Sequence, residues 1–353
     1  MSCKLKKITG AIFHDGQLGI VEGEVPELQD NQVLVEVYAS LISPGTELKS
    51  AAMRRQNPEP ADVEPTLFGY SNAGIILAVK GETKGLKPGM RVACMGAGAA
   101  QHSNYAVVPV NLVVPLPDNV TFEQGAYLSL AATSLQAVRR TGVRIGEYGA
   151  VLGLGIVGNL AAQLFKIGGG RVIGWESMAF RAELAKKCGI GATVDFTSED
   201  PVEITKNFAA PWGLDFALFA FGGDGEKAFG DIKKCMKVSA DGHAMGNITL
   251  VGGCRVPVDG GAASGNLNIR ISSRTGAGYH DPAWEYGKDY PAAFVQFTTM
   301  RNAVELLQLI GEKRLLVDEI TTHKIPLENI KEAGDALIEH PDQSLGVVLT
   351  MKH

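Results

Sequence analysis

Residues 151–158 read Val-Leu-Gly-Leu-Gly-Ile-Val-Gly, a Gly-x-Gly-x-x-Gly motif. The apolar run Tyr148 to Leu152 leads into the motif and predicts a buried strand. The segment Asn159 to Ile167 follows with the pattern of an amphipathic helix. Between a strand and a helix, such glycines are typical of a loop that holds the pyrophosphate of a dinucleotide. The motif therefore predicts a βαβ dinucleotide-binding domain.

Each glycine of the motif has a separate physical task. Gly153 allows the tight turn, Gly155 lets the backbone approach the phosphates, and Gly158 lets helix and strand pack closely. The phosphates then lie at the N-terminus of the helix that begins near Ile156 and Val157. Unpaired N–H groups and the helix dipole favour an anion there.

A carboxylate at the end of the next predicted strand supports this interpretation. Glu176 directly follows Arg171–Trp175 and lies 23 residues after Gly153. In this place a carboxylate accepts hydrogen bonds from the ribose hydroxyls and repels a 2′-phosphate, which favours NAD over NADP. Ser177 and Arg181 lie close by and leave NADP binding open as an alternative.

The order of the predicted elements indicates an α/β protein with two domains. Up to about residue 120 the chain reads as short strands and turns, beginning with the β-rich run Val33–Ala39. A helix is predicted from Phe122 to about Thr141, and strands then alternate with helices. Such alternation is typical of a doubly wound parallel sheet of the Rossmann type. A further helix is predicted over Ala293–Ile310, and the last strand over Gly346–Thr350.

Composition excludes several classes of protein. The net charge is −5 and no basic run occurs, so we expect no nucleic-acid partner. Neither a signal peptide nor an 18-residue apolar stretch is visible, so we expect a cytoplasmic protein without a membrane span. The five cysteines include no Cys-x-x-Cys pair, which disfavours a disulfide framework.

On these motifs the chain resembles the medium-chain dehydrogenase/reductase family, the relatives of zinc alcohol dehydrogenases. The residues that carry the resemblance are Gly45 and Gly69, the turn 87–92, Ala132-Thr133-Ser134, and the stretches 181–185 and 323–328. The resemblance implies a β-rich GroES-like catalytic domain, 1–122 completed by 311–353, and a Rossmann domain, 123–310. It also implies an active site between the domains, a nicotinamide contact for Ser134, and a homodimer or homotetramer.

The zinc ligands of that family are not present at the matching positions. Its Cys-Gly-Ser/Thr-Asp run corresponds to residues 44–47, where Pro44 takes the place of the cysteine. Its Gly-His-Glu run corresponds to residues 69–71, where Tyr70 takes the place of the histidine, and its third ligand falls near Leu130. Because Pro and Leu have no side-chain lone pair, we predict no metal at this position. An unusual site built from Glu47, His102 or His280 stays open as an alternative.

These departures resemble a zinc-free branch of the family. The resemblance implies NAD-dependent oxidation of a secondary hydroxyl of a small polyol or sugar, such as a glycoside or cyclitol, to a ketone. The stretch His340–Ser344 is similar to members acting on sugars. Two alternatives remain: an enoyl- or quinone-type NAD(P)H reductase, and a dinucleotide sensor that has lost its chemistry.

Without zinc, a side chain must accept the hydroxyl proton. Lys49 matches a proton-relay position of the zinc members, and Thr46 would pass the proton on to it. Tyr70 is a candidate phenolic acid or base, while Glu47 is a candidate for binding a substrate hydroxyl. Each also has a structural interpretation: a solvated helix charge for Lys49, and a filled ligand site for Tyr70.

The segment 272–290 contributes the remaining candidates. Tyr279, Asp281 and Trp284 offer the stacking ring and hydrogen-bonding groups that sugar binding needs, and His280 with Asp281 is a candidate acid–base pair. A loop that only supports a dimer contact explains the segment equally well. His102 is a candidate substrate contact, with a purely structural role as its alternative.

Overall fold

The chain divides into two units in the computed structural model, which describes residues 5–258 and 260–352. The first unit contains the residues up to Ala132, the segment Thr275–Lys313 and the residues from Thr321 onward. The second contains Thr133–Arg274 and Arg314–Ile320. The sequence boundaries assigned 123–310 to one domain, so the segment 275–310 lies in the other unit from the one expected. The physical reason is that its last helix, Thr299–Gly311, packs against the strand Val113–Pro115 and the short helix Val110–Leu112 of the first unit.

A six-stranded parallel sheet forms the centre of the second unit, in the order β11-β10-β9-β12-β14-β16. This order is that of a doubly wound dinucleotide-binding sheet. Its strands are β9 (Tyr148–Leu152), β10 (Arg171–Trp175), β11 (Ala192–Val194), β12 (Phe216–Phe219), β14 (Met245–Leu250) and β16 (Asn266–Ile271). The strands β13 (Gly223–Asp224) and β15 (Cys254–Arg255) pair separately.

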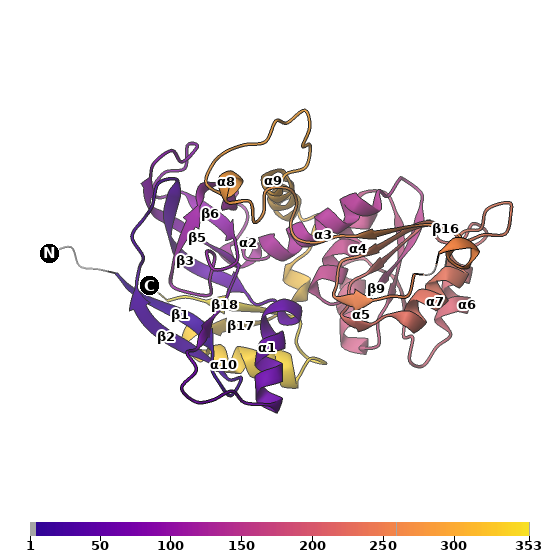
Figure 1. The fold of residues 1–353 in the computed structure, drawn as a ribbon, viewed down its shortest axis with the longest axis horizontal. Helices are drawn as coiled ribbons and strands as arrows, with labels where there is room; N and C mark the ends of the chain where they lie inside the picture. Colours follow the sequence, from indigo (N-terminus) through magenta and orange to yellow (C-terminus); the bar gives the residue numbers. More distant parts are fainter. Residues whose placement is uncertain (1–4, 259, 353) are drawn as a thin grey trace. The chain divides into compact units, whose positions relative to one another are not determined.

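Helices cover this sheet, as Figure 1 shows. They are α4 (Ile156–Ile167), α5 (Ala179–Lys187), α6 (Pro201–Phe208) and α7 (Glu226–Cys235). Strand β12 is buried along its whole length, and Phe216, Phe219 and Phe229 are each at most 1% exposed. Burying one such ring contributes about 1.5–3 kcal/mol to folding, so this core fixes the strand ends from which the loops emerge.

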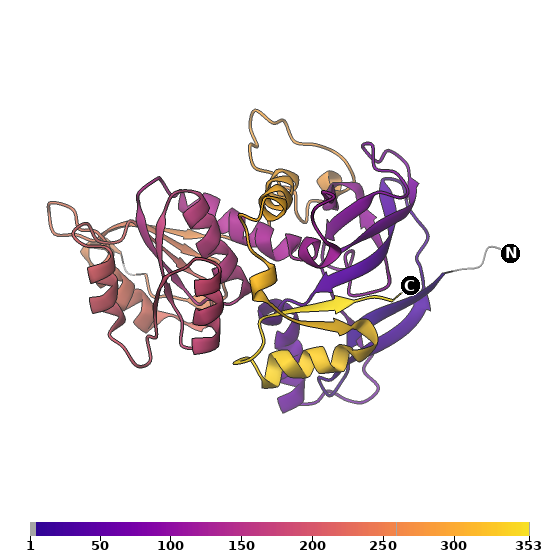
Figure 2. The ribbon, with the colours of Figure 1, turned by 180° about the vertical axis from the view of Figure 1, so that it is seen from behind.

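The first unit is built on a seven-stranded sheet in the order β17-β18-β3-β5-β6-β8, with β7 paired to β3. All of these pairs are antiparallel except β17 with β18. The strands are β3 (Gln32–Leu41), β5 (Ser71–Lys80), β6 (Arg91–Met95), β7 (Tyr105–Pro109), β8 (Val113–Pro115), β17 (Thr321–Pro326) and β18 (Gly346–Thr350). Figure 2 shows the C-terminal strands, in yellow, beside the N-terminal ones.

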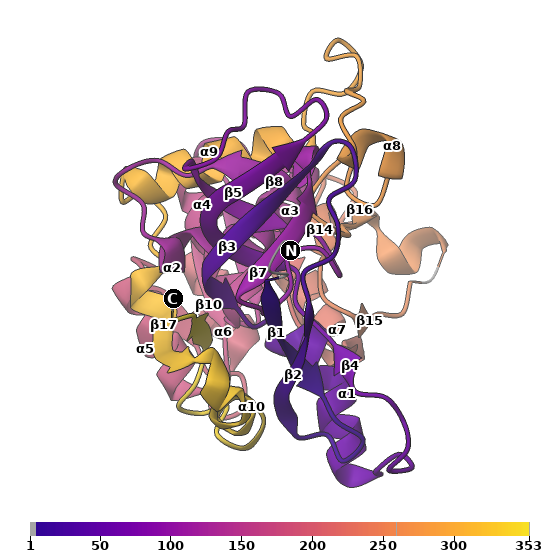
Figure 3. The ribbon, with the colours of Figure 1, turned by 90° about the vertical axis from the view of Figure 1, so that its left-hand side faces the viewer.

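A second, three-stranded sheet in this unit has the order β2-β1-β4 and lies near helix α1, as Figure 3 shows. Its strands are β1 (Lys6–Ile12), β2 (Leu18–Glu24) and β4 (Thr66–Leu67). The helices of the unit are α1 (Pro44–Gln56), α2 (Phe122–Gly125), α8 (Pro282–Glu285), α9 (Thr299–Gly311) and α10 (Ile330–Glu339). Arg55 of α1 forms ion pairs with Asp335 and Glu339 of α10, which joins the two helices.

Most predicted elements are confirmed, and the differences have local causes. The predicted helix Phe122–Thr141 is divided into α2 and α3 (Leu128–Thr141). The helix predicted from Ala293 begins only at Thr299, because the Thr298 hydroxyl accepts a hydrogen bond from Arg301 N and caps the helix there. None of the helices within residues 5–352 that the structure describes is long and apolar enough to cross a membrane.

Candidate active site

In the second unit, the geometry of the glycine loop agrees with the task that the sequence assigns to each glycine. Gly153 has φ +85°, a conformation that L side chains rarely adopt. A Cβ on Gly158 would lie 1.8 Å from the Gly153 carbonyl oxygen, so only glycine allows this approach of helix and turn. A Cβ on Gly155, the N-cap of α4, would meet nothing within 4 Å. The loop thus keeps open space at the helix N-terminus, where a phosphate fits.

Glu176 connects the end of β10 to this loop. The residue is 6% exposed; Oε2 accepts a hydrogen bond from Leu154 N at 2.8 Å, and Oε1 accepts one from Met178 N at 3.0 Å. Because a carboxylate oxygen can accept more than one hydrogen bond, capacity for ribose hydroxyls remains. The arrangement fits the adenosine end of a dinucleotide.

Two other residues predicted to bind the cofactor lie in the same unit. Ser134 is fully buried in α3, and its hydroxyl donates to the Val157 carbonyl oxygen at 2.9 Å, which joins α3 to the first turn of α4. Arg181 is half-buried on α5, and its Nε is buried without a hydrogen-bond partner in the described part of the chain. The sequence motif did not reveal either arrangement, since both depend on packing between helices.

In the first unit, the start of helix α1 brings Glu47 into the interior. Ser43 precedes the helix and Pro44 occupies its first position, which suits a ring with fixed φ and no N–H. Glu47 Oε2 accepts a hydrogen bond from Ser43 N at 2.7 Å, and the residue is 7% exposed. Its other oxygen, Oε1, is buried without a hydrogen-bond partner among the described residues.

His102 lies beside this carboxylate and is fully buried. Its Nε2 is 3.3 Å from Glu47 Oε2, and its Nδ1 is 2.9 Å from Ser40 Oγ. The ring also packs edge-on against Phe68, with 4.8 Å between the ring centroids. Ser40, His102 and Glu47 therefore form a continuous buried chain of polar groups. The predicted role of His102 as a substrate contact finds no support here, because the ring has no exposed surface.

Tyr70 is half-buried next to the same group. Burial, and then the negative charge of Glu47, raise the pKa of Tyr70 well above its ordinary value of 10.0. Hydrogen bonds with the side chains of Ser43 and Thr46 oppose this rise in pKa only in part. At neutral pH Tyr70 is therefore a protonated phenol, which can donate a hydrogen bond or a proton.

The candidates on the long loop behave differently from one another. The Tyr279 hydroxyl accepts a hydrogen bond from Ala97 N at 3.2 Å, and the neighbouring Gly96 N donates to the Tyr70 carbonyl oxygen at 3.0 Å. His280 is exposed and has φ +66°. Asp281 caps α8 by accepting from Ala283 N and Trp284 N, and it also accepts from the Tyr290 hydroxyl. Of these residues, Tyr279 is the one that the structure brings to Tyr70.

Comparisons with known proteins agree with this fold. Residues 29–118 match the alcohol dehydrogenase GroES-like domain. A trans-enoyl reductase from Aspergillus terreus is 30% identical over 208 residues, which cover 53% of this chain and 67% of that protein. The chain belongs to the medium-chain dehydrogenase/reductase family. The predicted α/β fold with GroES-like and Rossmann sheets is confirmed.

Further relatives within the family differ in the reaction that their names give. The 2-methylene-furan-3-one reductase of Solanum lycopersicum is 28% identical over 60% of this chain and 54% of its own length. The aligned region thus spans about half of that relative. The sorbitol dehydrogenase of Ovis aries is 23% identical over 96% of this chain and 94% of its own.

Solved structures of low sequence identity share the fold. Alcohol dehydrogenase TADH from Thermus sp. ATN1 has a TM-score of 0.78 at 19% identity, over 98% of this chain and 100% of that one. A Sinorhizobium meliloti 1021 protein described as a zinc-binding dehydrogenase, bound to NADP, has a TM-score of 0.74 at 19% identity, over 98% and 100%. An Escherichia coli CFT073 alcohol dehydrogenase complexed with NADH has a TM-score of 0.74 at 18% identity, over 98% and 99%.

The zinc-ligand positions of the family are occupied here by side chains of other types. Pro44 begins α1, Tyr70 is the half-buried phenol described above, and Leu130 is a 2% exposed core residue of α3. Cys94 is fully buried, and burial raises the pKa of its thiol far above the ordinary value. Across residues 5–258 and 260–352, no group of three His, Cys, Asp or Glu side chains is arranged to hold a metal ion.

Two further candidates, Lys49 and Trp284, lie in surroundings that differ from those expected. Lys49 is exposed on α1, so no closed apolar surrounding acts on its charge. Trp284 is 1% exposed and encloses Gly278, where a Cβ would lie 2.2 Å from the indole ring. The indole therefore packs inside the unit and has no exposed face on which a sugar ring could stack.

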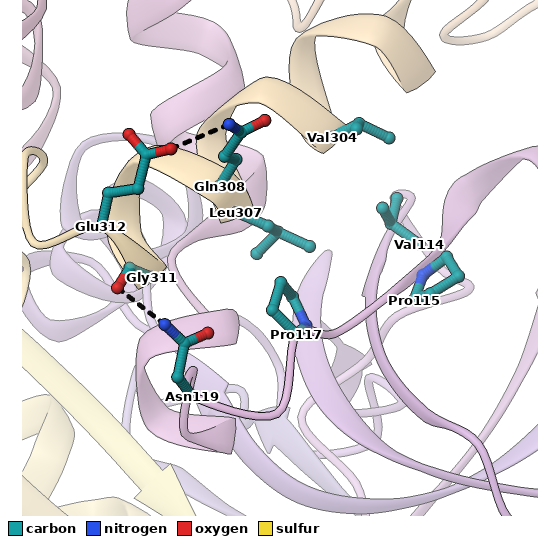
Figure 4. A pocket seen from close by; sticks show the side chains of 9 residues that line it. All are labelled: Val114, Pro115, Pro117, Asn119, Val304, Leu307, Gln308, Gly311 and Glu312. Atoms are coloured by element: carbon teal, nitrogen blue, oxygen red, sulfur yellow. Dashed lines mark hydrogen bonds between the residues drawn. The ribbon is translucent and has the colours of Figure 1, made fainter.

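A separate hollow of about 470 Å³ in the first unit lies along helix α9 (Figure 4). Apolar side chains such as Val114, Val304 and Leu307 line it. Its polar groups bond to each other, as Gln308 does to Glu312 and Asn119 Nδ2 to the Gly311 carbonyl oxygen. It contains none of the candidate catalytic side chains, so it does not coincide with the site around Tyr70.

Proposed function

We propose that this family member is an NAD-dependent, zinc-independent dehydrogenase. It would interconvert a secondary hydroxyl of a sugar, glycoside or cyclitol with the corresponding ketone. The observation that carries the proposal is the glycine loop with its open helix N-terminus and the adjoining Glu176 carboxylate. The similarity to sheep sorbitol dehydrogenase over nearly the whole chain supports a hydroxyl substrate.

The cofactor would be held by groups of the second unit. The space at Gly155 and the N-terminus of α4 would take the pyrophosphate, and Glu176 the ribose hydroxyls. The charge of Glu176 disfavours a 2′-phosphate and supports NAD, while the unpartnered Arg181 Nε acts in the opposite direction. When bound, NAD⁺ accepts the hydride. Ser134, which holds Val157 in place, would support the nicotinamide end.

The reacting oxygen would be bound by Tyr70 and Thr46 of the first unit. Tyr70 is protonated at neutral pH and can donate to a carbonyl oxygen in the direction of ketone reduction. Thr46 is exposed and hydrogen-bonds with Tyr70, so it can relay a proton between the substrate oxygen and Tyr70. The exposed Lys49 and His280 are less well supported as the acid or base, since neither lies in a desolvated site.

The test is a cofactor-by-substrate matrix. Purified protein is incubated with NAD⁺ or NADP⁺ and a panel of sugars, glycosides and cyclitols, and reduced cofactor and ketone product are both quantified. We expect equal amounts of NADH and ketone with at least one hydroxyl substrate, and a preference for NAD⁺. A panel without any turnover, although NAD binds, would contradict the proposed function.

A second candidate function is reduction of an enone, because the names of the tomato and Aspergillus relatives describe such reactions. A protonated Tyr70 would suit it equally, as a donor to the carbonyl oxygen of the enone. The two functions separate on substrate: an enone reductase consumes NAD(P)H with α,β-unsaturated carbonyls and leaves saturated ketones and polyols unchanged.

Two properties of the assembly belong to the same proposal. The chain would act on a small molecule in the cytoplasm as a homodimer or homotetramer, as implied by the family resemblance. Light scattering of the purified protein measures the mass directly, and a mass of one chain would contradict the oligomer.

A further inference from the structure

We infer that the second unit has a separate binding site for a small oxyanion, a phosphate or carboxylate group, at the N-terminal ends of its parallel strands. The site is a hollow of about 350 Å³. Small-molecule sites begin at about 300 Å³, so a ligand of metabolite size fits this volume. The side chains that carry the inference are those of Arg144, Lys237, Asn247, Asn266, Asn268 and Arg270, which all line the hollow.

The hollow lies at the end of the sheet opposite to the glycine loop. Among its lining residues, Asp215 directly precedes β12, Met245 begins β14 and Asn266 begins β16. The glycine loop instead follows Leu152, the last residue of β9. The strands β9, β12 and β14 are parallel neighbours, and a strand of five residues is about 17 Å long. A ligand in the hollow therefore would not compete with a pyrophosphate at Gly155.

The charges around the hollow favour an anion. Its lining contains three cationic and two anionic side chains, and both carboxylates already accept hydrogen bonds. Asp215 accepts from Lys237 Nζ at 2.7 Å and from Tyr148 N at 2.9 Å. Glu147 Oε2 accepts from Arg144 N at 2.8 Å. The positive charge of Lys237 is thus matched by Asp215, and the two arginines supply the excess positive charge.

Several hydrogen-bond donors of the hollow are still available. The Arg144 side chain is exposed, and its guanidinium has no hydrogen-bond or ion-pair partner in the described chain. Arg270 donates through Nη1 to the Arg140 carbonyl oxygen, which leaves its other N–H groups for a ligand. The exposed Asn266 amide also has no partner among the described residues. A guanidinium has the fork geometry that binds carboxylate and phosphate oxygens in pairs.

Two asparagines connect the walls of the hollow. Asn247 and Asn268 are register partners on β14 and β16, and Asn268 Nδ2 donates to Asn247 Oδ1 at 3.2 Å. Asn247 Nδ2 donates in turn to the Thr141 carbonyl oxygen at 3.0 Å. With the bond from Arg270 to Arg140, these contacts satisfy carbonyl groups at the C-terminal end of α3. The partial negative charge of that helix end is therefore largely neutralised and does not repel an anion.

The experiment is a calorimetric titration with inorganic phosphate at constant ionic strength, repeated with malonate as a dicarboxylate probe. NADH is present in excess, because it would displace an anion that binds at the glycine loop. We expect saturable binding of at least one probe, with one anion per chain. Binding that excess NADH abolishes would assign the anion to the glycine loop and overturn the inference.

Arg144→Gln is the test variant, and Lys187→Gln is its matched control. Each removes one positive charge from the second unit, but Lys187 is exposed at the end of α5 and does not line the hollow. We expect Arg144→Gln to raise the Kd of the anion roughly 10-fold or more, the usual loss with one charged hydrogen bond. Lys187→Gln should bind the anion like the wild type.

Thermal unfolding gives an independent readout of the same site. Without an added anion, Arg144→Gln should unfold at the wild-type temperature, because the guanidinium has no partner to lose in the described chain. A bound anion stabilises the folded state, so phosphate should raise the Tm of the wild type and of Lys187→Gln more than that of Arg144→Gln. Equal anion affinity in all three proteins, or no saturable binding of either probe, would overturn the inference.

Discussion

In the glycine loop, two similar Gly→Ala substitutions should affect different properties of the protein. In Gly155→Ala the new methyl group enters open space, with nothing within 4 Å of the Cβ. In Gly158→Ala the methyl group would lie 1.8 Å from the Gly153 carbonyl oxygen and 3.2 Å from the Ala220 Cβ. The first substitution should therefore affect binding, and the second should affect folding.

The magnitudes follow from these contacts. Gly155→Ala replaces a tolerated helix N-cap by a poor one and should lower the free energy of unfolding by about 1 kcal/mol. Its methyl group blocks backbone approach to a phosphate, and loss of one charged hydrogen bond of about 1.5–3 kcal/mol raises the Kd for NADH roughly 10- to 150-fold. Gly158→Ala overpacks a backbone carbonyl and should lower the free energy of unfolding by about 3 kcal/mol. The helix preference for Ala, about 1 kcal/mol, is too small to compensate.

The assay pairs denaturant unfolding with a fluorescence titration of NADH on the same samples. We expect reduced affinity with nearly normal stability for Gly155→Ala, and reduced stability for Gly158→Ala. Gly155→Ala protein that binds NADH like the wild type would refute the placement of the pyrophosphate at this helix N-terminus.

Three further substitutions test other parts of the account. Trp284→Ala should lower the free energy of unfolding by about 3–5 kcal/mol, because the indole is 1% exposed, and thermal unfolding measures it. Glu176→Ala should weaken NAD binding and reduce the preference for NAD over NADP. Unchanged Kd values for both cofactors would contradict the role of the carboxylate. The pKa of Tyr70 is raised in the folded protein, so the stability that its neutral form contributes is present below pH 10.0 and lost as pH rises above it. The wild type should therefore lose more stability above pH 10.0 than Tyr70→Phe does, and parallel curves would contradict the burial of the phenol.

Sequence periodicity was sufficient for the elements that are apolar throughout. The strands Tyr148–Leu152 and Arg171–Trp175 end where their apolar runs end, because both faces of a parallel strand are buried. The predicted start of α9 was wrong by six residues. The apolar pattern continues through Ala293–Thr298, and the only signal against a helix there is the capping residue Thr298.

The cofactor loop and the group around Glu47 differ in how much of each the sequence could predict. The cofactor loop lies within eight consecutive residues, so its glycines could be assigned tasks directly. His102 and Glu47, by contrast, are 55 positions apart and meet only because β3, α1 and the segment before β7 fold together. Ser40 carried no signal at all, although Ser43 before Pro44 is a recognisable helix start.

The most direct test of the central claim is turnover by metal-free protein. The protein is treated with a chelator, its residual zinc is quantified, and NADH formation is measured with NAD⁺ and the hydroxyl substrate found in the panel. The account predicts unchanged kcat in protein that contains far less than one zinc per chain. Loss of turnover on chelation, restored by added zinc, would contradict it.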